Sequence, residues 1–165
     1  MRLLFLFAFA LLYINGYSQK NNFGGNWKLD IAHSDFGGQI PGQAAPKTIV
    51  IALLKDSLQL ERDFEGSGVT KEVLPLNSKP ITIDLSKGAV KTKKETALEK
   101  STDDHQIVIH STYTVDDQDG SGQARHWQYT RTETYRLSED KSTLTLERIT
   151  VVPDRTDVIK AVYTQ

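Results

Sequence analysis

The chain has 165 residues, and its 20 Lys and Arg residues nearly balance 21 Asp and Glu residues, giving a formal net charge of −1 at pH 7. This balance, without a basic block or stripe, argues against nucleic acid as a partner. The sequence contains no cysteine, which excludes thiol catalysis and Cys-ligated metals. Since small eukaryotic secreted domains usually carry disulfides, and no Asn-x-Ser/Thr site occurs either, a bacterial exported protein is favoured.

The N-terminal segment 1–18 has the features of a secretion signal. A basic start precedes a short apolar run, and the small residues Gly16 and Ser18 stand where signal peptidase requires them. The run is short for a bilayer span, and no second run follows it, so a membrane anchor is the less favoured alternative. We predict a signal peptide cleaved near Ser18, a single mature domain over 19–165, a periplasmic or secreted location and no stable membrane anchor.

Alternation of apolar and polar residues dominates the rest of the chain, and no amphipathic helix longer than two turns is evident. Turns rich in Gly, Asn, Asp and Ser separate the strand-like segments. The expected strands are 25–31, 47–54, 57–64, 69–76, 80–85, 89–99, 105–115, 124–137, 142–152 and 157–164. Short connections make consecutive strands pair antiparallel, and about eight to ten strands can close and so remove exposed edges. We predict an all-β, antiparallel up-and-down β-barrel, with a two-sheet sandwich as the alternative.

Residues 32–46, between the first two expected strands, interrupt this rhythm. A connection of this length in a compact domain is often a lid or a binding loop, and a plain surface crossover is equally open. The segment is rich in Gly and Pro, which argues against a helix.

Alternate residues of a strand point to opposite faces of the sheet, and in each expected strand one of these two sets is the more apolar. We assign that set, the inward parity, to the barrel interior. The residues expected to point inward are Trp27, Leu29, Ile31, Leu58, Leu60, Arg62, Phe64, Ile107, Ile109, Tyr113, Val115, Trp127, Tyr129, Arg131, Glu133, Tyr135, Leu137, Leu144, Leu146, Arg148 and Val152.

Three arginines, Arg62, Arg131 and Arg148, share this inward parity. A charge inside a barrel is costly unless it is paired or bound by a ligand. One interpretation is a water-filled cavity whose guanidinium groups hold a carboxylate or another anion while aromatic side chains cover an apolar moiety. The alternative is that each arginine reaches solvent at a strand end or pairs with Glu133. The candidate ligand-binding residues are Arg62, Tyr113, Trp127, Tyr129, Arg131, Glu133 and Tyr135, with Arg131 and Glu133 as the best candidate pair.

No catalytic, metal or cofactor motif accompanies this pattern. The four histidines show no metal-ligand spacing, and the acidic turn 116–120 lacks the carboxylates that a calcium loop requires. Ser67 and Ser121 each lie between glycines but not in the strand–elbow–helix setting of a nucleophile. We therefore expect a protein that is not an enzyme and that uses no cofactor and no metal.

Two segments carry a resemblance to known proteins. Gly-Asn-Trp-Lys-Leu at 25–29, followed by Ser-Asp-Phe at 34–36, resembles the opening of the calycins, the group of lipocalins and intracellular fatty-acid-binding proteins. The pattern over 133–148, closing on Val-Tyr-Thr-Gln at 162–165, resembles small exported bacterial lipocalin-like proteins of unassigned function.

The resemblance implies a ligand-holding barrel in which Gly25, Trp27 and Arg148 are structural. Trp27 would lie at the closed end, stacked against Arg148 or Arg155 from a late strand. The Arg-x-Tyr carboxylate clamp of the fatty-acid binders has no match within 157–164, and their two-helix lid has no counterpart.

Three functional hypotheses follow. The leading one is an exported lipocalin-like barrel that binds a small hydrophobic or amphipathic ligand, with one or two arginines fixing an acidic end. The second is a structural or protein-interaction module of the cell envelope, with a solid core and an exposed apolar patch around Phe36 and Ile40. The third is an enzyme with His33 or His126 as a base, for which no nucleophile–base–orienter set can be assembled.

Overall fold

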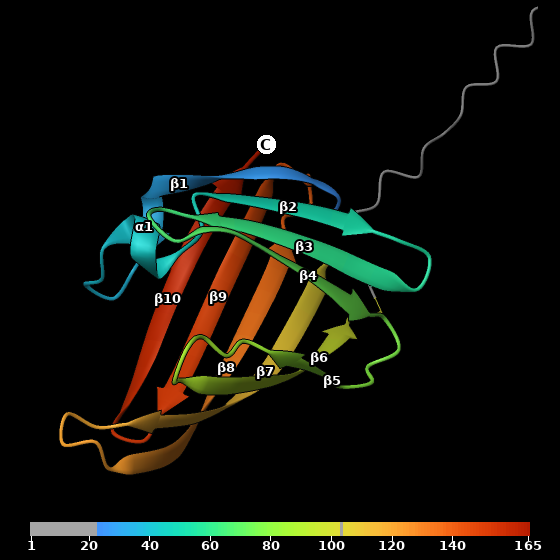
Figure 1. The fold of residues 1–165 in the computed structure, drawn as a ribbon. Helices are drawn as coiled ribbons and strands as arrows, with labels where there is room; N and C mark the ends of the chain where they lie inside the picture. The colour runs from blue at the N-terminus through green and yellow to red at the C-terminus, as the bar shows by residue number, and fades with distance from the viewer. Residues whose placement is uncertain (1–22, 103) are drawn as a thin grey trace, which may run out of the picture.

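A single antiparallel sheet of ten strands makes up the fold in the computed structural model, which describes residues 23–102 and 104–165 (Figure 1). The predicted signal peptide 1–18 lies outside the described residues, so its cleavage stays a prediction. The elements are β1 (Gly25–Asp35), α1 (Pro41–Ala44), β2 (Thr48–Leu53), β3 (Ser57–Phe64), β4 (Gly68–Pro75), β5 (Ile81–Asp84), β6 (Lys91–Lys100), β7 (Gln106–Gln118), β8 (Ala124–Leu137), β9 (Thr143–Val152) and β10 (Arg155–Thr164). Within the described ranges, no helix has the length and apolar character needed to span a membrane.

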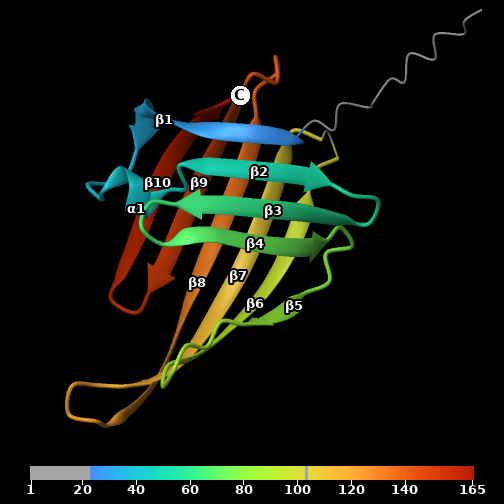
Figure 2. The same ribbon diagram turned by 45° about the horizontal axis from the view of Figure 1, so that its top comes forward.

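The strand order is β4-β3-β2-β1-β10-β9-β8-β7-β6-β5. Neighbours in the chain pair antiparallel, except that β4 and β5 do not pair, and β1 pairs with β10. The β1–β10 ladder joins the two meanders, and β1–β4 cross in front of the layer formed by β6–β10 (Figure 2). The prediction of an all-β up-and-down barrel is confirmed, with one unsealed seam between β4 and β5.

β1 is longer than the sequence pattern predicts, because it contains an irregularity. Its register against β10 shifts between Asp30 and Asp35. In this stretch the Asp30 carboxylate accepts the backbone N–H groups of Ala32 at 3.1 Å and of His33 at 3.3 Å. The prediction that Ile31 points inward is wrong: its side chain is 58% exposed, since the local turn rotates it out of the inward parity.

The connection between β1 and β2 packs onto the barrel. Residues 41–44 form the one-turn helix α1, with Pro41 at its start, so the expectation of no helix in this segment is wrong. Ala44 and Phe36 belong to the buried core, whereas Ile40 is 61% exposed. The expected apolar surface patch around Phe36 and Ile40 is therefore absent from the described surface, because Phe36 faces inward.

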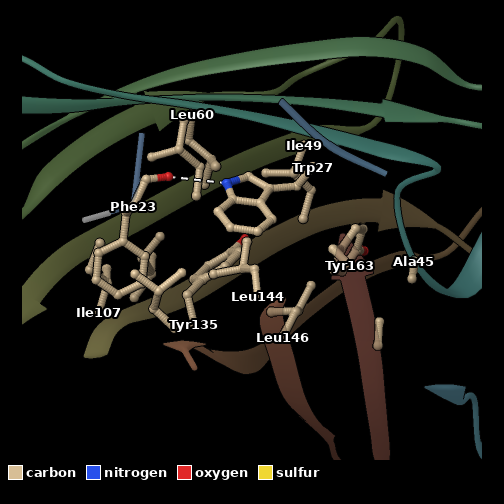
Figure 3. Packing of buried hydrophobic residues seen from close by; sticks show 14 of the residues in the cluster. Phe23, Trp27, Ala45, Ile49, Leu60, Ile107, Tyr135, Leu144, Leu146 and Tyr163 are labelled. Carbon is tan, nitrogen blue, oxygen red and sulfur yellow. Dashed lines mark hydrogen bonds between the residues drawn. The ribbon is translucent and has the colours of Figure 1, made fainter. Parts of the chain in front are cut away.

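Large buried apolar side chains pack together in one part of the barrel interior. Figure 3 shows Trp27 in the middle of this packing, with Phe23, Leu60 and Tyr135 around it. The indole Nε1 of Trp27 donates to the Phe23 carbonyl at 3.1 Å, and the Trp27 side chain is 0% exposed. Trp27 is thus part of the buried core, and its expected position at a closed end of the barrel stays a prediction.

The arginine stack that the resemblance implies for Trp27 does not occur in the described part of the chain. Arg148 donates to the Ala44 carbonyl, and Arg155 donates to the Asp157 carboxylate at 3.0 Å. At Gly25 a β-carbon would meet the end of the flexible Gln165 side chain, so the structural role expected for Gly25 stays a prediction.

Candidate functional site

The barrel interior changes from apolar to polar along β8, β9 and β10. Cross-strand neighbours with the same inward parity define three successive rows: Tyr135, Leu146 and Ala161, then Glu133, Arg148 and Ile159, then Arg131, Thr150 and Asp157. The first row belongs to the solid core. Of the candidate residues on β8, Glu133 and Arg131 therefore lie in the polar rows, whereas Tyr135 lies in the core.

A buried ion network occupies the middle of the barrel. From β3, Arg62 reaches across the interior and donates to the Glu133 carboxylate at 2.7 Å, to the Tyr135 hydroxyl at 3.1 Å and to the Glu72 carboxylate at 3.2 Å. Burial disfavours the charge, but Glu133, Tyr135 and Glu72 outweigh it and raise the pKa of Arg62 well above its usual value. The counter-ion of Glu133 is thus Arg62, one of the three arginines for which pairing with Glu133 was the alternative expectation.

Lys94 extends this network to the seam. Its Nζ donates to the Glu72 carboxylate at 2.6 Å, which links β6 to β4. Burial is the main effect on both groups: it lowers the pKa of Lys94, while for Glu72 the cations Arg62 and Lys94 outweigh it and hold the pKa below its usual value. Glu72 and Lys94 are not among the predicted site residues, although they share the inward parity of Leu74 and Leu98.

An inner cavity of about 240 Å³ lies above this network. Its lining residues come from β8, β9, β10 and the β1–β2 connection, namely Gln39, Trp127, Tyr129, Arg131, Arg148, Thr150, Val152, Arg155, Asp157 and Ile159. Two of them, Arg131 and Arg148, are interior cations, and a third cation, Arg155, is paired with Asp157 at 3.0 Å.

Arg131 and Arg148 have no carboxylate partner among the residues that the structure describes. Arg131 donates to the Thr150 hydroxyl at 3.4 Å, and Arg148 donates to the Ala44 carbonyl. Burial and the positive charge of Arg131 together lower the pKa of Arg148. Two guanidinium groups that form no salt bridge with a described carboxylate therefore face the inner cavity.

Two further cavities adjoin the inner one. A cavity of about 260 Å³ lies at the seam, and Arg131 lines both it and the inner cavity. An outer cavity of about 630 Å³ lies at the barrel mouth, and it shares Trp127, Val152 and Arg155 with the inner cavity. A row of lined spaces thus leads from the mouth to the seam.

Three aromatic rings form a stack on β7 and β8 next to these cavities. The Tyr113 and Tyr129 rings are 4.3 Å apart between centroids and 3° from parallel. Trp127 stacks on Tyr129 at 5.5 Å and 27°. The Arg131 guanidinium lies 5.5 Å from the Tyr113 centroid, so the stack and the cationic site are contiguous.

The structure distributes the predicted site residues over two cavities and the core. Trp127, Tyr129 and Arg131 line the inner cavity, and Arg62, Tyr113, Glu133 and again Arg131 line the seam cavity. Tyr135 lies in the core at 1% exposure, with its hydroxyl bound to Arg62. Arg148, expected to be structural, lines the inner cavity.

The histidines considered as bases are exposed and each contacts an aspartate. His126 lies 2.6 Å from Asp116 at the outer cavity, and His33 lies 2.7 Å from Asp30. Within 23–102 and 104–165, no group of three or more His, Asp or Glu residues could hold a metal ion.

Comparison with protein-family models, with curated proteins and with solved structures finds no match to this chain. The class of this protein is therefore given by its fold and by its candidate site. It is a ten-stranded antiparallel up-and-down barrel with one unsealed seam, and cationic and aromatic side chains line its inner cavity.

Proposed function

We propose that this protein is an exported, calycin-like barrel that binds a small amphipathic anion and releases it unchanged. The acidic group binds between Arg131 and Arg148, and the apolar part lies against Trp127 and Tyr129. The observation that carries the proposal is the pair of interior guanidinium groups, Arg131 and Arg148, that face one cavity without a carboxylate partner in the described residues.

The charges inside the barrel support this proposal. Arg62 and Lys94 are neutralised by Glu72 and Glu133, at distances between 2.6 and 3.2 Å. Arg131 and Arg148 remain as a cationic pair. Because a desolvated guanidinium without a counter-ion is costly, an anion entering the cavity would relieve that cost, and a carboxylate or sulfonate matches the guanidinium donors.

Export and the absence of catalysis rest on the sequence. The signal-like segment 1–18 and the lack of cysteine support a bacterial exported protein. The proposed relationship to the calycins rests on the Gly-x-Trp opening, and the barrel architecture is compatible with it. The competing interaction-module hypothesis is weakened, because Phe36 of its expected patch is buried.

A fluorescence titration with two matched probes tests the proposal. Anilinonaphthalene sulfonate is an anionic amphiphile, and phenylnaphthylamine is its uncharged parent. We expect the sulfonate to bind clearly more tightly, and Arg131→Gln to weaken its binding about tenfold or more, since a hydrogen bond to a charged group contributes roughly 1.5–3 kcal/mol.

Arg136→Gln is the matched control, because it removes one positive charge from the same strand. The Arg136 side chain is exposed and is bound to Gln106 and Glu147 outside the barrel. It should leave sulfonate binding unchanged. Equal binding of the two probes, or equal effects of the two substitutions, contradicts the proposal.

A further inference from the structure

The aromatic stack has a free end at the cavities. Tyr113 and Tyr129 lie face to face at 4.3 Å, so each covers one face of the other. Trp127 is the last ring of the stack and is only partly buried. Because its side chain borders both the inner and the outer cavity, its indole offers aromatic surface to whatever occupies them.

The passage between the inner and outer cavities is lined by three shared residues. These are Trp127 on β8, Val152 on β9 and Arg155 on β10. An indole, an aliphatic side chain and a guanidinium are all groups that pack against a flat ring. We call this passage the Trp127 slot.

The floor of the inner cavity prevents an apolar chain from extending further inward. Arg131 and Arg148 line the cavity, and Glu133, which lies directly opposite Arg148 and one row further in than Arg131, forms a buried ion pair with Arg62 at 2.7 Å. The apolar core beyond these charges is already filled by fully buried side chains such as Tyr135 and Leu146. The cavity itself, at about 240 Å³, is smaller than the ~300–1,000 Å³ of pockets for drug-sized ligands.

Of the two cavities that adjoin the inner one, the seam cavity is lined by the charged network of Arg62, Glu72, Lys94 and Glu133. The apolar part of a ligand held by Arg131 and Arg148 is therefore better accommodated outward, at the Trp127 slot. A long flexible chain leaving by this route would extend into the wide outer cavity and gain little burial. A rigid planar ring would stack on the indole and lose little conformational freedom.

Resting on the function proposed above, we infer that the ligand is an aromatic acid: its anionic group binds Arg131 and Arg148, and its ring stacks on Trp127 in the slot. The barrel thereby selects aryl acids over straight-chain fatty acids. Selection comes from Trp127, and retention of the anion comes from the two arginines.

Calorimetry with three probes tests this inference on the purified protein. Naphthalene-2-carboxylate is the aromatic acid, undecanoate is the straight-chain acid with the same number of carbon atoms, and naphthalene-2-methanol is the uncharged ring. We expect naphthalene-2-carboxylate to bind about tenfold more tightly than undecanoate, as ring stacking and rigidity predict. Trp127→Leu should abolish that preference, and Trp127→Phe, which keeps a ring, should retain most of it.

The outcomes separate this inference from the proposed function. If both acids bind equally and Arg131→Gln weakens both, anion binding stands and the aromatic preference is overturned. If the uncharged ring binds as tightly as its acid, the proposed function fails and the anionic part of the inference fails with it. If neither acid binds, both are overturned. Since Trp127 is partly exposed at the mouth, a circular dichroism spectrum like that of the unaltered protein should accompany both variants.

Discussion

Lys94 on β6 and Glu72 on β4 form a 2.6 Å ion pair across the one seam of the barrel that has no backbone ladder. The Lys94 side chain is only 3% exposed. Glu72 also accepts from Arg62 on β3 at 3.2 Å, so the seam is joined to the same buried network that holds Glu133. A side-chain ion pair thus links β4 to β6 where no backbone ladder joins the two ends of the sheet.

Lys94→Met should loosen the seam without changing the topology. The substitution leaves Glu72 with one cation in place of two, and breaking a buried pair by removing one partner costs about 3–5 kcal/mol. We expect faster amide hydrogen exchange in β4 and β5 and a lower free energy of unfolding in urea. Lys93→Met is the control, since Lys93 is exposed on the opposite parity; equal effects of the two substitutions would show that the ion pair does not hold the seam.

Acid should destabilise the barrel through Glu72. Burial raises the pKa of this carboxyl, but Arg62 and Lys94 outweigh burial and place the pKa below the ordinary value of 4.5. Because the folded-state pKa is the lower one, Glu72 contributes its full stability above about pH 4.5 and loses it as the pH falls through the folded value. Urea unfolding between pH 7 and pH 3 should therefore show a smaller loss for Glu72→Gln. An unchanged pH profile in that variant would contradict this assignment.

Tyr163→Phe should not destabilise the protein. The Tyr163 hydroxyl is buried and has no hydrogen-bond partner within the described part of the chain, and burial raises its pKa well above the usual value. An unsatisfied buried polar group costs roughly 1–3 kcal/mol, so its removal should leave the free energy of unfolding equal or higher. Tyr135→Phe is the contrasting variant, because the Tyr135 hydroxyl accepts from Arg62 at 3.1 Å, and it should be less stable. A loss in Tyr163→Phe as large as in Tyr135→Phe would refute this prediction.

Arg148→Met should free the β1–β2 connection from the barrel wall. The guanidinium donates to the carbonyl of Ala44, the last residue of α1. We expect faster hydrogen exchange at the Ala44 and Ala45 amides, which bond to Ile40 and Pro41 at 2.8 and 2.9 Å. Arg155→Met removes the same charge from the same cavity without a bond to this segment, and it should leave those amides protected. Protection that survives in Arg148→Met would show that apolar packing alone holds the segment.

The strands could be predicted because residues close together in the sequence determine where each one begins and ends. Alternation of period two and Gly- and Asp-rich turns place all ten strands, and the same parity correctly turns Arg62 and Arg148 inward. Ile31 was mispredicted for a reason that is also local. The Asp30 side chain accepts the backbone N–H groups of Ala32 and His33, where the register against β10 shifts, an effect that hydropathy alone does not report.

The pairing of the interior charges was not predictable, because it depends on contacts far apart in the sequence. Glu133 could pair with Arg131 on its own strand, with Arg148 directly opposite on β9, or with Arg62 on β3. Only the three-dimensional closure of the barrel brings Arg62, 71 positions away, to 2.7 Å. Parity identifies which side chains share the interior, but it does not identify which of them meet.

The central claim is that Arg131 and Arg148 hold the ligand's anionic group, and side-chain arginine NMR tests it most directly. The Nε–Hε signals of Arg131, Arg148 and Arg62 would be assigned through Arg-to-Lys variants and followed while naphthalene-2-carboxylate is added. We expect the Arg131 and Arg148 signals to shift in proportion to bound ligand. The Arg62 signal should move little, since Glu133, Tyr135 and Glu72 already occupy its donors. Saturable binding that leaves the Arg131 and Arg148 signals in place would contradict the account.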